Sequence, residues 1–186
     1  MWFVWREFRE EKLERYKEAE IDEEIRNLLD LINSVEKFVT LSSCSGRIAV
    51  MDMPKFGEKV ESVFLGKWHS VPNYNDVYEA VRRGKRTTWL MMHPPIVHVA
   101  CKDFRSAEEI LRVAKLSGFR RSGIISPKKF VVEIAAPERV EAVVAVGGKI
   151  ADEEFLRINY EIAVEKLIKS RRRMEKFEEY FREAFR

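Results

Sequence analysis

Cysteine is scarce in this chain, and long apolar runs are missing from it. Two of its 186 residues are cysteine, Cys44 and Cys101, which is too few for a disulfide framework, so we expect a reducing, cytoplasmic setting. No apolar run approaches the roughly 20 residues that cross a bilayer. The N-terminus turns charged at once, at Arg6 and Glu7, so the sequence predicts neither a membrane span nor a signal peptide.

The sequence also lacks the motifs of common cofactor, metal and hydrolase sites. No G-x-G-x-x-G follows an apolar run, which argues against a Rossmann nucleotide site. Paired C-x-x-C or H-x-x-x-H spacings are absent, so no metal site is expected. There is no G-x-S-x-G elbow, and a hydrolase pair of Ser43 with a histidine has no evident third member.

Charge is distributed unevenly along a chain whose composition is typical of a globular protein, with 46% apolar and 35% charged residues. Residues 1–36 contain 6 Lys/Arg and 11 Asp/Glu, residues 37–150 contain 19 and 11, and residues 151–186 contain nine of each. The whole positive balance therefore lies in the middle segment, where we expect a polyanion such as nucleic acid to bind.

Apolar periodicity and turn residues predict a mixed order of helices and strands. Helices are expected over residues 2–18, after a cap at Asp22, from Asn73 or Asn75 to Arg83, over 107–117 after a cap at Ser106, and over 153–184. Strands are expected near residues 37–41, 47–52, 60–68, 86–92, 96–101, 122–125, 129–135 and 140–146.

This order predicts an α/β or α+β fold that forms a single domain over residues 1–186, around one mixed β-sheet flanked by helices. Its expected parts are the N-terminal helices in residues 1–36, the sheet core in 37–150 and the C-terminal helix in 151–186.

The most unusual stretch is Ser42-Ser43-Cys44-Ser45-Gly46-Arg47, which lies between two apolar runs. Small polar residues at a strand junction suit a place where the backbone and a ligand approach closely. An extended chain directs Ser43 and Ser45 to one face and Cys44 to the other, while Arg47 adds a planar cation.

The three histidines fall within 30 residues of one another. His69 and His93 lie at strand ends, and His98 lies inside an apolar strand, where it is either satisfied in the core or directed into a pocket. A neutral imidazole accepts a proton near pH 7, so these residues are candidates for a general base.

A second polar stretch, Ser117-Gly118-Phe119-Arg120-Arg121-Ser122-Gly123, follows an expected helix. Two arginines between glycines suit phosphate contact, and a helix C-terminus with exposed charges is the alternative. For Arg171-Arg172-Arg173 near the C-terminus we expect a solvated helix face.

Taken together, several stretches resemble the tRNA wybutosine-synthesising protein 3 family across nearly the whole chain. The resemblance rests on Ser42–Ile48, Trp68-His69, Pro95–Cys101 and Ser117–Gly123. It implies a methyltransferase that uses S-adenosylmethionine, without the Rossmann methyltransferase fold. The implied substrate is N4 of a tricyclic 4-demethylwyosine-type base at position 37 of phenylalanine tRNA, in wyosine and wybutosine biosynthesis.

The chain departs from the family pattern at three places. Arg121 stands where the family commonly has Asn, and His93-Pro94-Pro95 stands where a Glu-Pro pair is usual. His69 follows Trp68 directly, where family members often separate the two.

With this resemblance we assign hypothetical roles to particular residues. We expect catalysis from His69, His98 and Ser43, with His69 or His98 receiving the proton lost from the acceptor nitrogen. For the cofactor we expect Ser43, Ser45, Gly46, Arg47, Ser122 and Gly123. For the anticodon loop we expect Arg82, Arg83, Lys85, Arg86, Arg120 and Lys128.

Trp68, Tyr74, Trp89 and Phe119 are candidate base-stacking residues or, alternatively, core residues. No DNA, membrane or metal partner is expected. The alternative function is a non-catalytic RNA-binding module.

Overall fold

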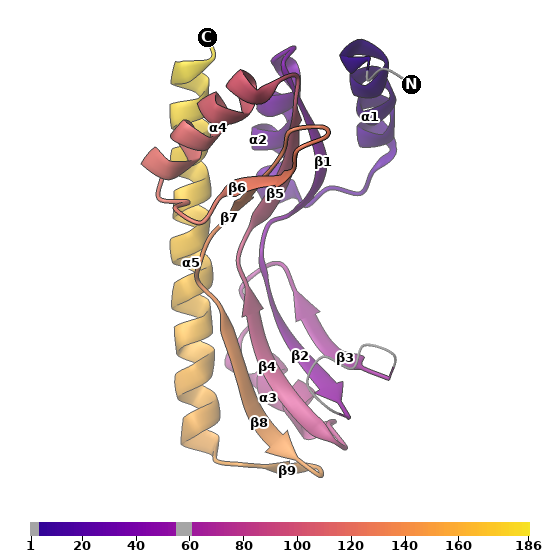
Figure 1. Cartoon of the computed structure of the whole chain (residues 1–186). Helices are drawn as coiled ribbons and strands as arrows, with labels where there is room; N and C mark the ends of the chain where they lie inside the picture. Colours follow the sequence, from indigo (N-terminus) through magenta and orange to yellow (C-terminus); the bar gives the residue numbers. More distant parts are fainter. Residues whose placement is uncertain (1–3, 55–60) are drawn as a thin grey trace. The chain divides into compact units, whose positions relative to one another are not determined.

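The computed structural model describes residues 4–54 and 61–186 (Figure 1). Within these ranges the helices are α1 (Trp5–Glu18), α2 (Glu23–Ser34), α3 (Tyr74–Arg82), α4 (Phe104–Leu116) and α5 (Glu153–Ala184). The strands are β1 (Phe38–Cys44), β2 (Arg47–Met53), β3 (Val63–Trp68), β4 (Thr87–His93), β5 (Ile96–Cys101), β6 (Gly123–Ser126), β7 (Val131–Ala135), β8 (Val140–Val146) and β9 (Lys149–Ile150).

The chain forms two compact units, each assembled from separate stretches of sequence. Unit 1 contains the described residues of Met1–Ser45, Pro95–Pro137 and Arg171–Arg186. Unit 2 contains those of Gly46–Pro94 and Glu138–Ser170. The chain therefore passes four times from one unit to the other, and the single domain expected over residues 1–186 stays a prediction.

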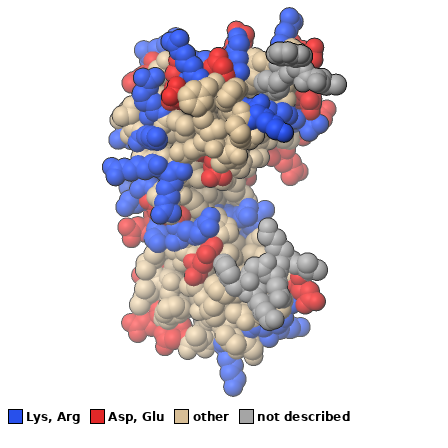
Figure 2. Space-filling model, viewed as in Figure 1, with Lys and Arg blue, Asp and Glu red and all other residues tan. Residues whose placement is uncertain are grey.

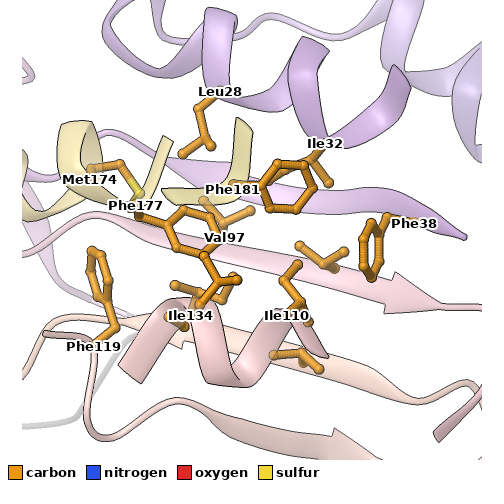
Figure 3. Close-up of a cluster of buried hydrophobic side chains, with 14 of the residues drawn as sticks. Leu28, Ile32, Phe38, Val97, Ile110, Phe119, Ile134, Met174, Phe177 and Phe181 are labelled. Atoms are coloured by element: carbon orange, nitrogen blue, oxygen red, sulfur yellow. The ribbon is translucent and has the colours of Figure 1, made fainter. Parts of the chain in front are cut away.

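Unit 1 contains a four-stranded sheet in the order β1-β5-β7-β6. Its main core lies on one face of this sheet, where apolar side chains of α2, α4 and the last part of α5 point toward one another (Figure 3). This core contains four fully buried phenylalanines: Phe38, Phe119, Phe177 and Phe181. They pack the helices against this face of the sheet.

The opposite face of the same sheet is covered in part by α1. Trp5, Phe8 and Leu13 of α1 pack against a small cluster of Val39, Ala100 and Val131. Successive residues of a strand point to opposite faces, so β5 directs Val97 and Val99 into the main core and His98 to the α1 side. The sequence alternation predicted this division.

Unit 2 contains a five-stranded sheet in the order β3-β2-β4-β8-β9. Its core is formed by apolar residues of β2, β4 and β8 together with α3 and the first part of α5. Asn73 caps α3, since its side chain accepts a hydrogen bond from the backbone N–H of Asp76. Of the two starts that the sequence left open, Asn73 and Asn75, the structure selects Asn73.

The structure confirms the α+β class and corrects the expected single mixed sheet. Every strand pair within the described ranges is antiparallel, and the strands divide between two sheets. β1 pairs with β5, whereas β2 pairs with β3 and β4, so the two runs around the polar stretch belong to different sheets.

Several element boundaries also differ from the prediction. α4 begins at Phe104 rather than Ala107, because Asp103 rather than Ser106 is its cap and accepts from the backbone N–H of Ser106. Residues 2 and 3 of the first expected helix and residue 60 of the third expected strand lie outside the described residues. None of the helices within the described ranges is long and apolar enough to cross a membrane.

Candidate functional site

A row of three polar side chains crosses the open part of the second face of the unit 1 sheet. Ser42 of β1 lies opposite His98 of β5, and His98 lies opposite Glu133 of β7. Ser42 Oγ is 2.7 Å from His98 Nδ1, and His98 Nε2 is 2.9 Å from Glu133 Oε2. The antiparallel register thus joins a hydroxyl, an imidazole and a carboxylate into one hydrogen-bonded chain.

The serine that meets His98 is Ser42 and not Ser43. The β1–β5 register shifts between Thr40 and Ser42, which is the mark of a β-bulge. As a result Ser43 lies opposite Val97, while Ser42 takes the position beside the imidazole. The β1–β5 register therefore does not place Ser43 beside His98.

A cavity of about 480 Å³ in unit 1 adjoins Ser42 and Ser43. Its walls come from α1, the α1–α2 connection, α2 and the edge of β1. They are formed by Lys12, Arg15, Tyr16, Ala19, Glu20, Ile21, Leu29, Thr40, Leu41, Ser42 and Ser43. This volume falls in the range of small-molecule sites, which are about 300–1,000 Å³.

Ser45 is fully buried and is held through its peptide groups. Its N–H donates to Asp22 Oδ2 at 2.7 Å, and its carbonyl oxygen accepts from Arg171 Nε at 3.2 Å. Arg171 also lies 3.9 Å from Glu24 Oε1, so this arginine is not the solvated side chain that was expected. Gly46 follows with φ of 82°, a conformation that glycine adopts most easily.

Cationic side chains meet at one end of the unit 2 sheet. Arg47 begins β2 directly opposite His93, the last residue of β4. His93 Nε2 lies 3.6 Å from Glu141 Oε1, and an Arg139 guanidinium nitrogen lies 3.8 Å from the same oxygen. Burial, and then the charges of Arg139 and Arg47, lower the pKa of His93. Such a cluster suits a carboxylate or phosphate.

His69 lies in unit 2 as well. It is half-buried and directly follows Trp68, the last residue of β3. The sequence placed it correctly at a strand end, and its catalytic role stays a prediction.

The second polar stretch folds as a tight connection after α4 in unit 1. Gly118 has φ of 96°, and an added Cβ there would lie 3.3 Å from the side chain of Arg173. Phe119 is fully buried, so it is a core residue rather than a base-stacking one. Gly123 opens β6 opposite Glu133.

Ser122 provides an unsatisfied hydroxyl in the same connection. It is 8% exposed, and its Oγ has no hydrogen-bond partner among residues 4–54 and 61–186. A buried hydroxyl without a protein partner costs free energy unless solvent or a ligand contacts it.

Five of the six basic residues expected to contact RNA are exposed, namely Arg82, Arg83, Lys85, Arg120 and Lys128. Arg82 Nη1 lies 3.3 Å from Glu79 Oε1. Arg83 donates to the Leu65 carbonyl, and Arg86 Nε lies 3.3 Å from the buried Asp52 carboxylate, so these two also stabilise unit 2. Positive and negative side chains are interspersed on the face that Figure 2 shows.

Glu133 is the site residue that sequence reasoning missed. It is the single charged residue in Val131-Val132-Glu133-Ile134-Ala135, a strand with buried apolar neighbours. The same signal, a lone polar residue in an apolar strand, singled out His98. Ser42 was part of the noted motif, but the bulge that aligns it is not visible in the sequence.

The fold is an α+β fold built on antiparallel sheets, and its polar row could move a proton. The family model of methyltransferase TYW3 matches residues 3–183, and the chain belongs to this family. It is therefore a methyltransferase, which confirms the predicted family and enzyme class.

Curated relatives match almost the whole chain. A protein of Archaeoglobus fulgidus is 46% identical over 181 residues, which cover 95% of this chain and 92% of the relative. It is named tRNA(Phe) 7-((3-amino-3-carboxypropyl)-4-demethylwyosine(37)-N(4))-methyltransferase. A Pyrococcus horikoshii protein, named as methyltransferase 1 of the same kind, is 39% identical and covers 87% of this chain and 85% of its own length.

Solved structures have the same fold. The PH1069 protein from Pyrococcus horikoshii superposes with a TM-score of 0.90 and 36% identity, covering 95% of each chain. A hypothetical protein from Aeropyrum pernix gives a TM-score of 0.76 at 26% identity, covering 88% of this chain and 98% of the other.

Proposed function

We propose that this protein transfers a methyl group from S-adenosylmethionine to N4 of a tricyclic 4-demethylwyosine-type base at position 37 of phenylalanine tRNA. The observation that carries the proposal is the 46% identity, over 95% of the chain, to a relative named for this reaction. Nothing in the comparisons favours a non-catalytic RNA-binding module. The reaction takes place in the cytoplasm, on the anticodon loop.

Methyl transfer requires that the acceptor nitrogen is aligned with the methyl group and that this nitrogen loses one proton. The sulfonium of S-adenosylmethionine supplies an activated methyl group, so the displacement needs no metal ion. Because the donor is already activated, most of the catalysis comes from holding the acceptor nitrogen in line with the methyl carbon. The acceptor N–H must lose its proton as the new N–C bond forms.

Each unit, taken by itself, contains side chains whose chemistry suits one functional group of the cofactor. The Arg47 guanidinium, beside His93 and Arg139, suits the methionine carboxylate. The unsatisfied Ser122 hydroxyl suits a ribose or adenine edge, and the adjacent Gly123 permits close approach. Ser43, Ser45 and Gly46 complete the proposed cofactor-binding residues, and their roles are tested by calorimetry with S-adenosylmethionine.

The matched calorimetric variants are Arg47→Gln and Arg105→Gln. Arg105 is an arginine of α4 whose side chain is 89% exposed. The proposal expects Arg47→Gln to weaken cofactor binding at least tenfold and Arg105→Gln to leave it unchanged. Equal affinities for the two variants would remove Arg47 from the site.

The proton and RNA roles follow from the same reaction. His98 or His69 takes up the proton lost by the acceptor. Ser43 is the third residue that we propose for catalysis. Arg82, Arg83, Lys85, Arg86, Arg120 and Lys128 contact the anticodon arm, and RNA loops are read through phosphate contacts and splayed bases.

The function is tested by incorporation of isotope-labelled methyl. Phenylalanine tRNA that carries the demethylated tricycle is compared with an unmodified transcript of the same tRNA. The proposal expects stoichiometric incorporation into the first and none into the second. Binding of both RNAs without incorporation would indicate the RNA-binding module instead.

A further inference from the structure

We propose that Ser42, His98 and Glu133 form a proton relay in which the Ser42 hydroxyl is the group that deprotonates the acceptor nitrogen. This inference rests on the proposed methyl transfer and deepens it, because it selects one histidine and adds two residues. Ser42 is the catalytic residue, His98 takes up the proton through it, and Glu133 is a positioning residue.

For a neutral imidazole beside an ionised carboxylate, the hydrogen-bond geometry sets the direction of the relay. An ionised carboxylate can only accept hydrogen bonds, so the His98 Nε2 that lies 2.9 Å from Glu133 Oε2 carries a hydrogen. In the neutral imidazole, Nδ1 is then the acceptor. Ser42 Oγ, 2.7 Å from Nδ1, must therefore donate its own hydrogen to the ring.

Donation to the ring leaves the lone pairs of the Ser42 oxygen available. Its hydrogen is held by Nδ1, which leaves the oxygen free to accept from another donor. Ser42 is exposed and forms part of the wall of the 480 Å³ cavity, so a donor in that cavity can reach it. His98 is 24% exposed and sits behind the serine on the neighbouring strand.

One wall of the cavity contains an aromatic ring that suits a heterocyclic base. Tyr16 lies in this wall, and its hydroxyl donates to Asp30. Lys12 and Arg15 of α1 also line the cavity and form ion pairs with Glu11, while Glu20 adds a negative charge. The cations are already paired, so the ring of Tyr16 is the feature that suits a base. The acceptor base can enter this cavity, of whose wall Ser42 forms part.

Atoms and electrons balance in the transfer step. The N4–H bond breaks and its electron pair forms the new N4–CH₃ bond, while the CH₃–S bond breaks and leaves its electron pair on sulfur. The N4 proton passes to Ser42 Oγ as the serine hydrogen passes to His98 Nδ1. The imidazolium that results faces the Glu133 carboxylate, which stabilises its charge.

Steady-state kinetics test the relay on the full chain with cofactor and demethylated tRNA. Ser42→Ala is expected to lower kcat at least 100-fold with KM within twofold, the scale of general-base catalysis. Glu133→Gln is expected to lower kcat on the order of tenfold, with recovery in Glu133→Asp. Ser34→Ala and Glu108→Gln, exposed residues of α2 and α4, are the matched controls.

The tautomer of His98 provides a readout independent of activity. Nitrogen-15 chemical shifts of the wild-type imidazoles, with His98 assigned through His98→Gln, are expected to show a hydrogen on Nε2 and a lone pair on Nδ1. Glu133→Gln is expected to mix the tautomers, whereas Glu108→Gln is not. A purely structural Glu133 would change stability without changing the tautomer.

Two results would overturn the relay. One is a wild-type tautomer with the hydrogen on Nδ1, and the other is a Ser42→Ala rate equal to that of Ser34→Ala. Either leaves the proposed methyl transfer intact, since wild-type turnover is measured in the same experiment. Absence of wild-type turnover would instead reject the proposed function and the relay with it.

Discussion

The carboxylate of Asp22 accepts a hydrogen bond from the backbone N–H of Ser45, with 2.7 Å between Oδ2 and N. Asp22 stands at the start of α2, yet its side chain makes no cap bond to that helix. Its carboxylate instead holds the polar stretch that follows β1. Because Ser45 is fully buried, loss of this acceptor leaves an N–H without compensation from water.

We therefore predict that Asp22→Ala lowers the free energy of unfolding by about 1–3 kcal/mol. Asp22→Asn, which keeps an acceptor oxygen, is expected to lose less. Urea unfolding measures both, with Glu18→Ala at the exposed end of α1 as the control. Equal stabilities for Asp22→Ala and Glu18→Ala would show that this bond contributes nothing.

Gly118 and Gly123 offer a matched test of backbone strain in unit 1. Gly118→Ala is expected to lower the free energy of unfolding by about 1–2 kcal/mol, because φ of 96° disfavours a side chain and the added Cβ meets Arg173. Gly123→Ala meets nothing within 4 Å and is expected to be nearly neutral. The prediction fails if Gly123→Ala is the more destabilised of the two in urea.

His93 makes stability depend on pH in a defined direction. Burial, and then the charges of Arg139 and Arg47, lower its pKa in the folded protein. The unfolded chain takes up this proton near the ordinary pKa of about 6.5, so below that pH the unfolded state binds more protons. The free energy of unfolding should therefore fall as pH drops from 7.5 to 5.

The variant that isolates this effect is His93→Gln. It removes the titrating group, so its stability is expected to change less than the wild type's between pH 7.5 and 5. Urea unfolding at both pH values gives the comparison. An identical pH dependence in the two proteins would assign the effect to other groups.

Substitution of exposed basic residues should affect RNA binding alone, whereas substitution of a basic residue that bonds a buried carboxylate should affect stability as well. Measurement of tRNA affinity against salt concentration separates the two. Arg120→Glu with Lys128→Glu is expected to weaken tRNA binding and to reduce the salt slope by about one for each phosphate that the protein no longer neutralises. Arg86→Gln is expected to lower stability as well, since Arg86 bonds the buried Asp52. An unchanged slope in the double variant would place the RNA elsewhere.

Local patterns predicted most elements of this fold, but not how they divide between sheets. The strands Ile96–Cys101 and Val140–Val146 and the helix Glu153–Ala184 have the expected bounds, because apolar alternation and helical periodicity are local properties. The partition into two antiparallel sheets depends on pairing between distant strands, as in β1 with β5, which no local pattern encodes.

The sequence predicted His98 and the polar stretch around Ser42 as parts of the candidate site, but not the hydrogen bonds that join the site residues. His98 stood out as a lone polar residue in an apolar strand, and Glu133 carries the same signal without having been used. The choice of Ser42 over Ser43 depends on the bulge after Thr40, and neither glycine nor proline marks that bulge in the sequence. One residue of register thus decides which serine meets the histidine.

The most direct test of the central claim is nucleoside mass spectrometry of phenylalanine tRNA carrying the demethylated tricycle, after incubation with this protein and S-adenosylmethionine. Methyl transfer to N4 predicts that the tricyclic nucleoside at position 37 gains the mass of one methyl group, and that no other nucleoside changes. A tricyclic nucleoside of unchanged mass, or a methyl group on a different nucleoside, would contradict the account.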